Sequence, residues 1–349
     1  MTPLQILFKT IKLFLLFIFV SVFLSVFLVI ISLSLLSKSI NRPPNYLIET
    51  IYSSIKENPY KSVDKINFLI LGLDERNDAL EKTSTTDTII LASLNLKTFK
   101  LNLISTPRDL WFYQKETKIN SLYPMSLESN ENKFDFLKSN FENLYGQPIN
   151  HIIVLTTDNL ISFVNLIGGV DLYLDKGFVD NQYPNPEYIK NPSPEIPIYK
   201  TIEFPSGQIH LDQNNITEFV RSRKSAETAT NGGTDIGRIA RQQLLIEAIL
   251  NKIKSGELIN DKDQLKNLYF FWDKEISKTL SDIDALQIIL ALEEDVTKIS
   301  LNKIEIPIGL NAKDGIIYHP LSFINKQWVY ITSDDKYQSF QEFIKNSIN

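Results

Sequence analysis

No cysteine occurs among the 349 residues of the chain. A domain built from it therefore has no disulfides and depends on packing, and no Cys-x-x-Cys zinc motif exists. The three histidines, His151, His210 and His319, lie far apart, which gives little support for a histidine metal site or a His-based triad. A Walker-type lysine loop and an HExxH motif are also missing, so neither nucleotide hydrolysis nor zinc chemistry is indicated.

Arginine is scarce in this chain. Only seven of the 36 basic residues are arginine, and the others are lysine. Arginine offers a rigid, permanently charged fork that suits phosphate and carboxylate groups. Four of the seven fall between Arg221 and Arg241, and this clustering predicts an anion site. The net charge of −5 argues against general nucleic-acid binding.

One long hydrophobic run stands near the N-terminus. Residues 13–37 carry no charge, and their length is enough to cross a bilayer core with some tilt. Lys9 and Lys12 precede the run, which predicts a cytoplasmic tail at residues 1–12. No small-residue cleavage site follows, so an uncleaved signal anchor is favoured over a signal peptide. The expected product is a single-pass protein of the cell membrane whose large domain lies outside the cytoplasm.

The rest of the chain divides into three parts. Residues 38–64 hold three prolines amid mixed polarity and are predicted to be a linker. Residues 65–256 are expected to form the main folded domain, and residues 257–349 a C-terminal extension that packs on or completes it. Strands mixed with helices predict an α/β or mixed α+β fold, with a central sheet core flanked by helices.

Apolar runs and helical spacing give the expected elements. Strands are predicted at residues 66–73, 88–96, 100–105, 151–155, 170–174 and 303–308, the second and third forming a hairpin. Helices are predicted at residues 134–145, 158–167, 212–219, 234–255, 282–296 and 337–348. Residues 175–208, rich in proline, are predicted to be a long loop with a strand piece near 199–204.

Two groups of basic residues stand out. Arg238, Arg241 and Gln242 share one face at the start of the predicted helix, where backbone amides and the helix dipole favour phosphate. Arg221 and Arg223 are two apart and point the same way on an extended segment. The alternative for both groups is a solvated basic surface.

Acidic residues and one more arginine lie at predicted strand ends. Asp74 ends one strand, Asp87 begins another, and Arg108 follows a third after Pro107. Ligand sites in α/β proteins gather at such ends, and two carboxylates beside phosphates could hold Mg²⁺. Each aspartate alone also fits an ordinary turn or capping role.

Seven motifs in this order resemble the LytR-CpsA-Psr family over about residues 64–254. They read INFLILGLDER, TTDTIILASLN, LISTPRD, KIN, GGVDLYL, FVRSRK and DIGRIARQQ. The resemblance implies an enzyme that transfers an anionic glycopolymer from a polyprenyl-pyrophosphate carrier to a peptidoglycan hydroxyl and leaves one lipid phosphate behind. It also implies a hydrophobic groove for the prenyl chain and a requirement for Mg²⁺ or Mn²⁺.

The resemblance assigns roles residue by residue. The metal would be held by Asp74 and Asp87. The pyrophosphate would be bound by Arg108, Arg221, Arg223, Arg238, Arg241 and Gln242, and the catalytic group comprises Arg108, Asp109, Arg238 and Gln242. The chain departs from the family pattern in having Thr86 where serine is usual and in a longer loop between Arg223 and Asp235.

Two other functions remain open from the sequence. With water as the acceptor, the same site would make a polyprenyl-pyrophosphate hydrolase. Without turnover, the protein would be an envelope component that binds polyprenyl phosphate or wall polymer. The arginine set favours catalysis over simple binding but does not separate transfer from hydrolysis.

Overall fold

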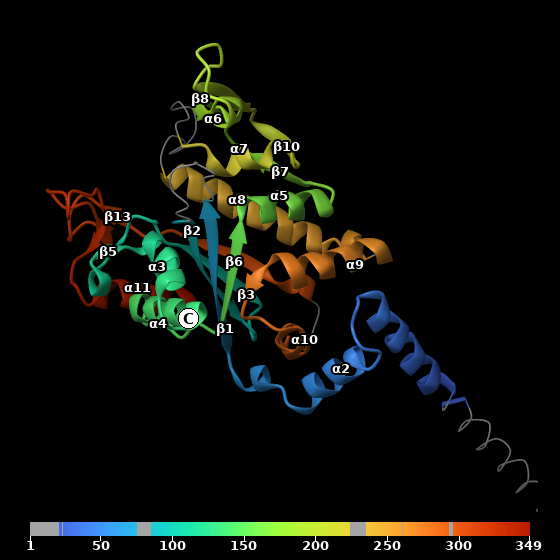
Figure 1. Ribbon diagram of the computed structural model, residues 1–349. Coiled ribbons are helices and arrows are strands. Elements are labelled where there is room, and N and C mark those ends of the chain that lie inside the picture. The colour runs from blue at the N-terminus through green and yellow to red at the C-terminus, as the bar shows by residue number, and fades with distance from the viewer. Residues whose placement is uncertain (1–20, 23, 75–84, 224–234, 260, 293–295) are drawn as a thin grey trace, which may run out of the picture. The chain divides into compact units, whose positions relative to one another are not determined.

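The computed structural model describes residues 21–22, 24–74, 85–223, 235–259, 261–292 and 296–349 (Figure 1). The chain divides into two compact units. The smaller comprises Met1–Pro59 with Asp282–Leu290, and the larger comprises Tyr60–Ser281 with Ala291–Asn349.

The smaller unit is helical where it is described. Residues 24–39 form one helix, and α2 (Tyr46–Lys56) occupies part of the segment predicted as a linker. The prolines lie on either side of α2, where they do not interrupt its hydrogen bonds. The helix α10 (Asp282–Ala291) meets α2 through a hydrogen bond from the Tyr46 hydroxyl to the Asp282 carboxylate.

The predicted anchor at residues 13–37 lies partly outside the described residues, which begin at 21. Within the part of the chain that is described, no helix combines the length and the apolar character needed to span a bilayer.

A mixed six-stranded sheet forms the centre of the larger unit, in the order β11-β6-β1-β2-β3-β12. Its strands are β1 (Lys65–Asp74), β2 (Thr85–Asn95), β3 (Lys100–Ser105), β6 (His151–Thr156), β11 (Ser277–Lys278) and β12 (Ser300–Ile304). The β2–β3 pair is antiparallel, which confirms the predicted hairpin, and β1 runs parallel to β6. The short turn at Asn95 is closed by its side chain, which accepts from the amides of Lys97 and Thr98 at 3.0 and 2.9 Å.

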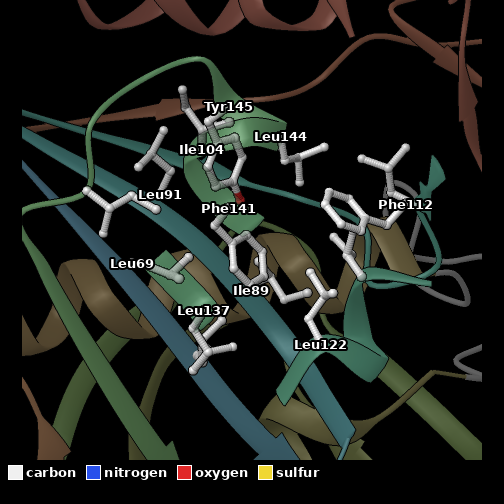
Figure 2. Close-up of a cluster of buried hydrophobic side chains, with 14 of the residues drawn as sticks. Leu69, Ile89, Leu91, Ile104, Phe112, Leu122, Leu137, Phe141, Leu144 and Tyr145 are labelled. Atoms are coloured by element: carbon white, nitrogen blue, oxygen red, sulfur yellow. The ribbon is translucent and has the colours of Figure 1, made fainter. Parts of the chain in front are cut away.

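One face of the sheet is covered by α3 (Leu122–Glu128), α4 (Lys133–Tyr145) and α11 (Gln338–Ile348). Large side chains from these helices and from β1–β3 make the main core (Figure 2). Helix α4 ends as predicted at Gly146, whose φ of 63° closes the helix and would strain a residue with a side chain. Because α11 contributes Phe340 and Ile344 to this core, the distant C-terminal segment is part of the same domain.

The opposite face carries α5 (Thr157–Leu166) and α8 (Asp235–Lys254). Helix α5 begins with a capping box between Thr156 and Asn159, and both helices lie close to their predicted bounds. A second core joins α5 and α8 to α7 (Ile216–Arg221) and to two antiparallel strand pairs. These pairs are β7 (Val170–Leu174) with β10 (Gly207–Leu211), and β8 (Phe178–Pro184) with β9 (Tyr199–Phe204).

The prediction of a long loop at residues 175–208 is wrong at β8, at the short helix α6 (Pro186–Lys190) and at the start of β10. The strand piece predicted near residues 199–204 is confirmed by β9. Prolines at the strand ends interrupt the apolar pattern that predicts strands. The pairing of β8 with β9 is stabilised by aromatic packing, since the rings of Phe178 and Phe204 stack with centroids 5.0 Å apart.

Smaller elements complete the larger unit. They are β4 (Trp111–Phe112), β5 (Thr117–Lys118), α9 (Lys262–Phe270), a π-helical turn (Phe271–Glu275), β13 (Ile308–Gly309), β14 (Ile317–Tyr318) and β15 (Ile331–Thr332). The strand predicted at residues 303–308 begins earlier, at Ser300, because it pairs in parallel with β3. The architecture is a mixed α/β fold with a central mixed sheet flanked by helices, as the sequence predicted.

Candidate functional site

The site is centred on Asp87, near the start of β2. Its Oδ1 accepts a hydrogen bond from Arg108, which follows β3, and its Oδ2 accepts one from Arg223, which follows α7. Arg238, in the first turn of α8, donates to Oδ2 at 3.4 Å and to the Asp87 carbonyl at 3.2 Å. Three arginines far apart in the sequence thus converge on one carboxylate.

Electrostatics keeps this carboxylate ionised. Burial favours the neutral form of Asp87, but the guanidinium groups of Arg108, Arg223 and Arg238 outweigh burial and hold the pKa of Asp87 below its ordinary value. Within these four groups, three positive charges face one negative charge. Arg238 is only 2% exposed, so part of this charge is withdrawn from water. Such an arrangement favours binding of a further anion.

The backbone of β1 permits this convergence. The register between β1 and β2 shifts at Gly72 and Leu73, directly opposite the start of β2. A Cβ at residue 72 would come within 2.9 Å of the Thr88 Cβ, so glycine allows the two strands to approach beside Asp87.

The predicted metal pair is described in part. Asp74 ends β1 and its backbone pairs with Thr85, two residues before Asp87. The side chain of Asp74 lies outside the described part of the structure. Among the described residues, no three carboxylate or histidine side chains gather to hold a metal. Mg²⁺ commonly combines one or two carboxylates with phosphate and water.

Gln242 and Arg221 lie near the arginine cluster. Gln242, one turn after Arg238 on α8, donates to the Val220 carbonyl at 3.4 Å. Arg221 ends α7 instead of lying on the extended segment that the sequence predicted. Both side chains line the same cavity as Asp87.

The contacts of Arg241 differ from those of Arg238 and Gln242 on the same helix. It is 5% exposed, and its guanidinium donates to the carbonyls of Phe219 (2.9 Å) and Ser222 and stacks over the Phe178 ring at 4.5 Å. Burial, helped by the charge of Arg238, lowers the pKa of Arg241 to about 10 despite the opposing effect of Asp180. Arg241 therefore remains charged at neutral pH and secures the end of α7.

Asp180, on β8, is a site residue that sequence reasoning missed. It is 1% exposed, and its Oδ2 accepts from the Ser222 hydroxyl at 2.7 Å and from the Arg223 amide at 3.3 Å. Asp180 therefore fixes the backbone that carries Arg221 and Arg223. No sequence signal pointed to it, because its strand was taken for a loop.

Asp109 supports the segment around Arg108. Its carboxylate accepts from Lys118 at 2.7 Å and lies 3.6 Å from the Arg108 Nε. The backbone amide of Asn120 donates to the Arg108 carbonyl at 3.3 Å. The backbone carbonyl of Asn120 accepts a hydrogen bond from the Thr86 hydroxyl, also at 3.3 Å. The KIN motif at residues 118–120 thus ties Arg108 to the start of β2.

An apolar cavity of about 360 Å³ adjoins the arginines. Asp87, Arg221, Arg223, Arg238 and Gln242 form part of its wall. Most of the remaining wall is hydrophobic and comes from the sheet, α5, α8 and the π-helical turn: Ile70, Ile90, Ile153, Leu155, Leu160, Phe163, Leu245, Ile246, Ile249, Phe271, Trp272 and Ile276. The volume is in the range typical of small-molecule sites. The site thus combines an anion-binding group with a hydrophobic chamber.

Comparison with known proteins agrees with this chemistry. TagU of Oceanobacillus iheyensis, a polyisoprenyl-teichoic acid–peptidoglycan teichoic acid transferase, is 26% identical over 280 residues, covering 79% of this chain and 74% of the relative. Bacillus subtilis TagV has a similar structure, with a TM-score of 0.55 at 16% identity over 82% of this chain and 97% of the other. A structure of TagT bound to LIIa-WTA matches with a TM-score of 0.52 at 18% identity, over 84% and 94% of the two chains. The sequence model of the LytR_cpsA_psr family matches residues 41–345, and the chain therefore belongs to the LytR-CpsA-Psr family.

Proposed function

We propose that this protein is a membrane-anchored transferase that moves an anionic glycopolymer from a polyprenyl-pyrophosphate carrier to a hydroxyl group of peptidoglycan. The observation that carries the proposal is the arginine cluster around Asp87 in the wall of an apolar cavity. A polyprenyl pyrophosphate has the same two parts, a dianionic headgroup and a hydrocarbon chain.

The headgroup is bound by arginine forks. Arg108, Arg223 and Arg238 already surround one carboxylate, and a pyrophosphate offers more oxygens to the same donors. Arg221 and Gln242, which line the cavity, extend this set. Arg241 acts on the backbone of α7 and thereby positions Arg221 and Arg223.

The hydrocarbon chain lies in the cavity between the sheet and helices α5 and α8. Each buried methylene contributes about 0.8 kcal/mol, so even a short part of a prenyl chain adds several kcal/mol to binding. Hydrophobic side chains make up most of the cavity wall and leave few hydrogen-bonding partners for the hydroxyl groups of a glycan.

In the reaction, an acceptor hydroxyl oxygen attacks the phosphorus that carries the glycan, and the bond from that phosphorus to the bridging oxygen breaks. The polyprenyl phosphate leaves, and the hydroxyl proton is released to solvent. Phosphoryl transfer depends mainly on positioning and on stabilising charge on the phosphoryl oxygens. Arg108 and Arg238 supply that charge, while Asp109 orients Arg108 together with Lys118.

Mg²⁺ or Mn²⁺ fits this site when substrate oxygens join the protein ligands. Asp87 would supply one carboxylate and Asp74, at the adjacent end of β1, a second. The ion would add positive charge at the pyrophosphate.

The hydrophobic run at residues 13–37 is proposed as the membrane anchor. This places the N-terminus in the cytoplasm and the larger unit in the envelope, where carrier and peptidoglycan meet. Protease added to intact spheroplasts should digest the protein beyond residue 45; complete protection would contradict this topology.

Reconstituting the full chain in lipid nanodiscs tests the activity. The protein is incubated with a synthetic lipid-pyrophosphate oligosaccharide, peptidoglycan and Mg²⁺, and products are identified by mass spectrometry. Transfer gives a glycan-phosphate-peptidoglycan conjugate. Free glycan phosphate without conjugate would identify a hydrolase, and an unchanged donor that still binds would identify a non-catalytic protein. An Arg238→Met variant serves as the inactive control.

A further inference from the structure

A group of aromatic side chains, two of them exposed and two half-buried, lies outside the cavity on residues 319–330, here called the aromatic hairpin. Its turn is a two-residue turn at Asn325 and Lys326, both with positive φ, between Ile324 and Gln327, which pair as an antiparallel bridge. Turns of this kind fit the natural twist of paired strands, so the hairpin is a defined structure.

The rings of the aromatic hairpin contact one another. His319 lies 6.1 Å from the Phe323 ring and 4.8 Å from the Trp328 ring, and Trp328 lies 4.6 Å from the Tyr330 ring. The rings of His319 and Tyr330 are inclined to the Trp328 ring at 64° and 78°, so each packs edge-on against the indole and neither stacks parallel to it. Phe323 remains 64% exposed and Trp328 40% exposed, although both are among the residue types that proteins prefer to bury.

The composition of the aromatic hairpin narrows the class of partner. Between residues 316 and 332, Lys326 is the single residue with a permanent charge, while the exposed polar side chains include Asn325 and Gln327. An anionic polymer or an anionic membrane surface needs several cations. Rigid aromatic rings beside amide groups suit a neutral glycan, whose sugar rings present C–H faces for stacking and hydroxyl groups for hydrogen bonds.

The base of the aromatic hairpin is joined to the functional site. The Tyr330 amide donates to the Asp109 carbonyl at 2.9 Å, and its carbonyl accepts from the Trp111 amide at 2.8 Å. Tyr330 therefore pairs with Leu110, two residues beyond Arg108. Trp328 lies two residues before Tyr330, about 7 Å along an extended strand. A glycan resting on the rings thus lies within a few sugar units of the pyrophosphate site.

We propose that the aromatic hairpin is a binding surface for a neutral glycan strand and presents the acceptor to the arginine site. The identification of this glycan as the acceptor rests on the proposed function. The binding of a glycan rests only on the hairpin.

The test compares the full chain with a Phe323→Ala/Trp328→Ala variant. Tyr173→Ala is the matched control, because Tyr173 is an aromatic residue of the larger unit that is 62% exposed and outside the hairpin. Binding is measured by co-sedimentation with peptidoglycan sacculi stripped of attached polymers, and with soluble N-acetylglucosamine oligomers by fluorescence. A thermal shift with farnesyl pyrophosphate reports the donor site independently.

We expect the double variant to bind sacculi and oligomers roughly tenfold or more weakly, as truncated aromatic anchors usually do, with an unchanged farnesyl pyrophosphate shift. The control should behave as the wild type. Equal glycan binding by the double variant overturns the proposal. So does a selective loss of binding to phosphatidylglycerol vesicles, which would make the hairpin a membrane contact. If farnesyl pyrophosphate has no effect on the wild type while glycan binding still depends on the hairpin, the proposed function fails and the glycan surface stands.

Discussion

Asp87→Asn removes one negative charge and almost no volume from the centre of the arginine cluster. In the structure each carboxylate oxygen of Asp87 accepts from at least one guanidinium, so the variant leaves three cations facing a neutral amide. Removing one partner of a buried ion pair costs about 3–5 kcal/mol. The Arg108 and Arg223 side chains are 20% and 29% exposed, and solvent screening places the expected loss at the low end, about 3 kcal/mol. At roughly 2–4 °C per kcal/mol for a domain of this size, Tm should fall by about 6–12 °C.

The same variant changes the response to anions. With EDTA present, the Asp87 carboxylate competes with an added anion for the arginines. Inorganic pyrophosphate should therefore raise the Tm of Asp87→Asn more than that of the wild type, because binding to the native state adds stability. With Mg²⁺ the order should reverse, since the wild type retains the carboxylate that the ion needs.

Differential scanning fluorimetry of both proteins, with and without pyrophosphate, provides the measurement. Glu218→Gln is the matched control: its carboxylate is paired with Lys200 and is 22% exposed, but it takes no part in the arginine cluster. A Tm for Asp87→Asn within about 1 °C of the wild type in EDTA, together with equal pyrophosphate shifts, would refute the reasoning. Asp87 would then be a surface charge of little consequence.

Further predictions concern protein stability at acid pH, the guanidinium groups of Arg108 and Arg238, and the carboxylate of Asp180. The pKa of Asp87 in the folded protein lies below its ordinary value of 3.8. The stability that the ionised Asp87 carboxylate gives the protein is therefore complete above pH 3.8 and is lost as the pH falls below that value. The Tm difference between wild type and Asp87→Asn should thus narrow at acid pH; a constant difference would contradict this. Arg108→Lys and Arg238→Lys keep the charge but lose the fork, and transfer should fall about tenfold or more in each, nearly as far as with alanine. Full activity in the lysine variants would show that charge alone suffices. Asp180→Asn should raise the KM for the lipid donor by releasing Arg223, and farnesyl pyrophosphate should then give a smaller thermal shift; an unchanged shift would reduce Asp180 to a purely structural role.

The parts of the fold that the sequence predicted well depend on local pattern. Strands β1, β2 and β3 and helix α4 follow from apolar runs, a short turn and a glycine at a helix end. Strand β8 was missed and β9 was predicted only as an isolated strand piece, because their pairing depends on partners about 20 residues apart and on the ring packing of Phe178, Phe204 and Phe219. No window of sequence contains that information.

For the functional site, residue spacing predicted which side chains share one face of α8, but not which group each of these side chains contacts. Arg238 and Arg241 were expected to act together because they are three residues apart on α8. In the structure Arg238 reaches Asp87, whereas Arg241 meets carbonyls at the end of α7, where a helix leaves backbone acceptors unsatisfied. Which of two neighbouring arginines contacts a helix end is fixed by tertiary packing, and the sequence carries no local signal for it.

The position of β12 has a consequence for folding order. Every residue of the arginine cluster precedes residue 242, yet the edge of β3 is paired by β12, and α11 supplies Phe340, Ile344 and Ile348 to the main core. A chain synthesised from its N-terminus would carry all these arginines before the edge of β3 and the main core could close. The domain that holds the cluster is therefore completed by segments that contribute no side chain to it, and a protein shortened after α8 should remain an unfolded chain with all its motifs intact.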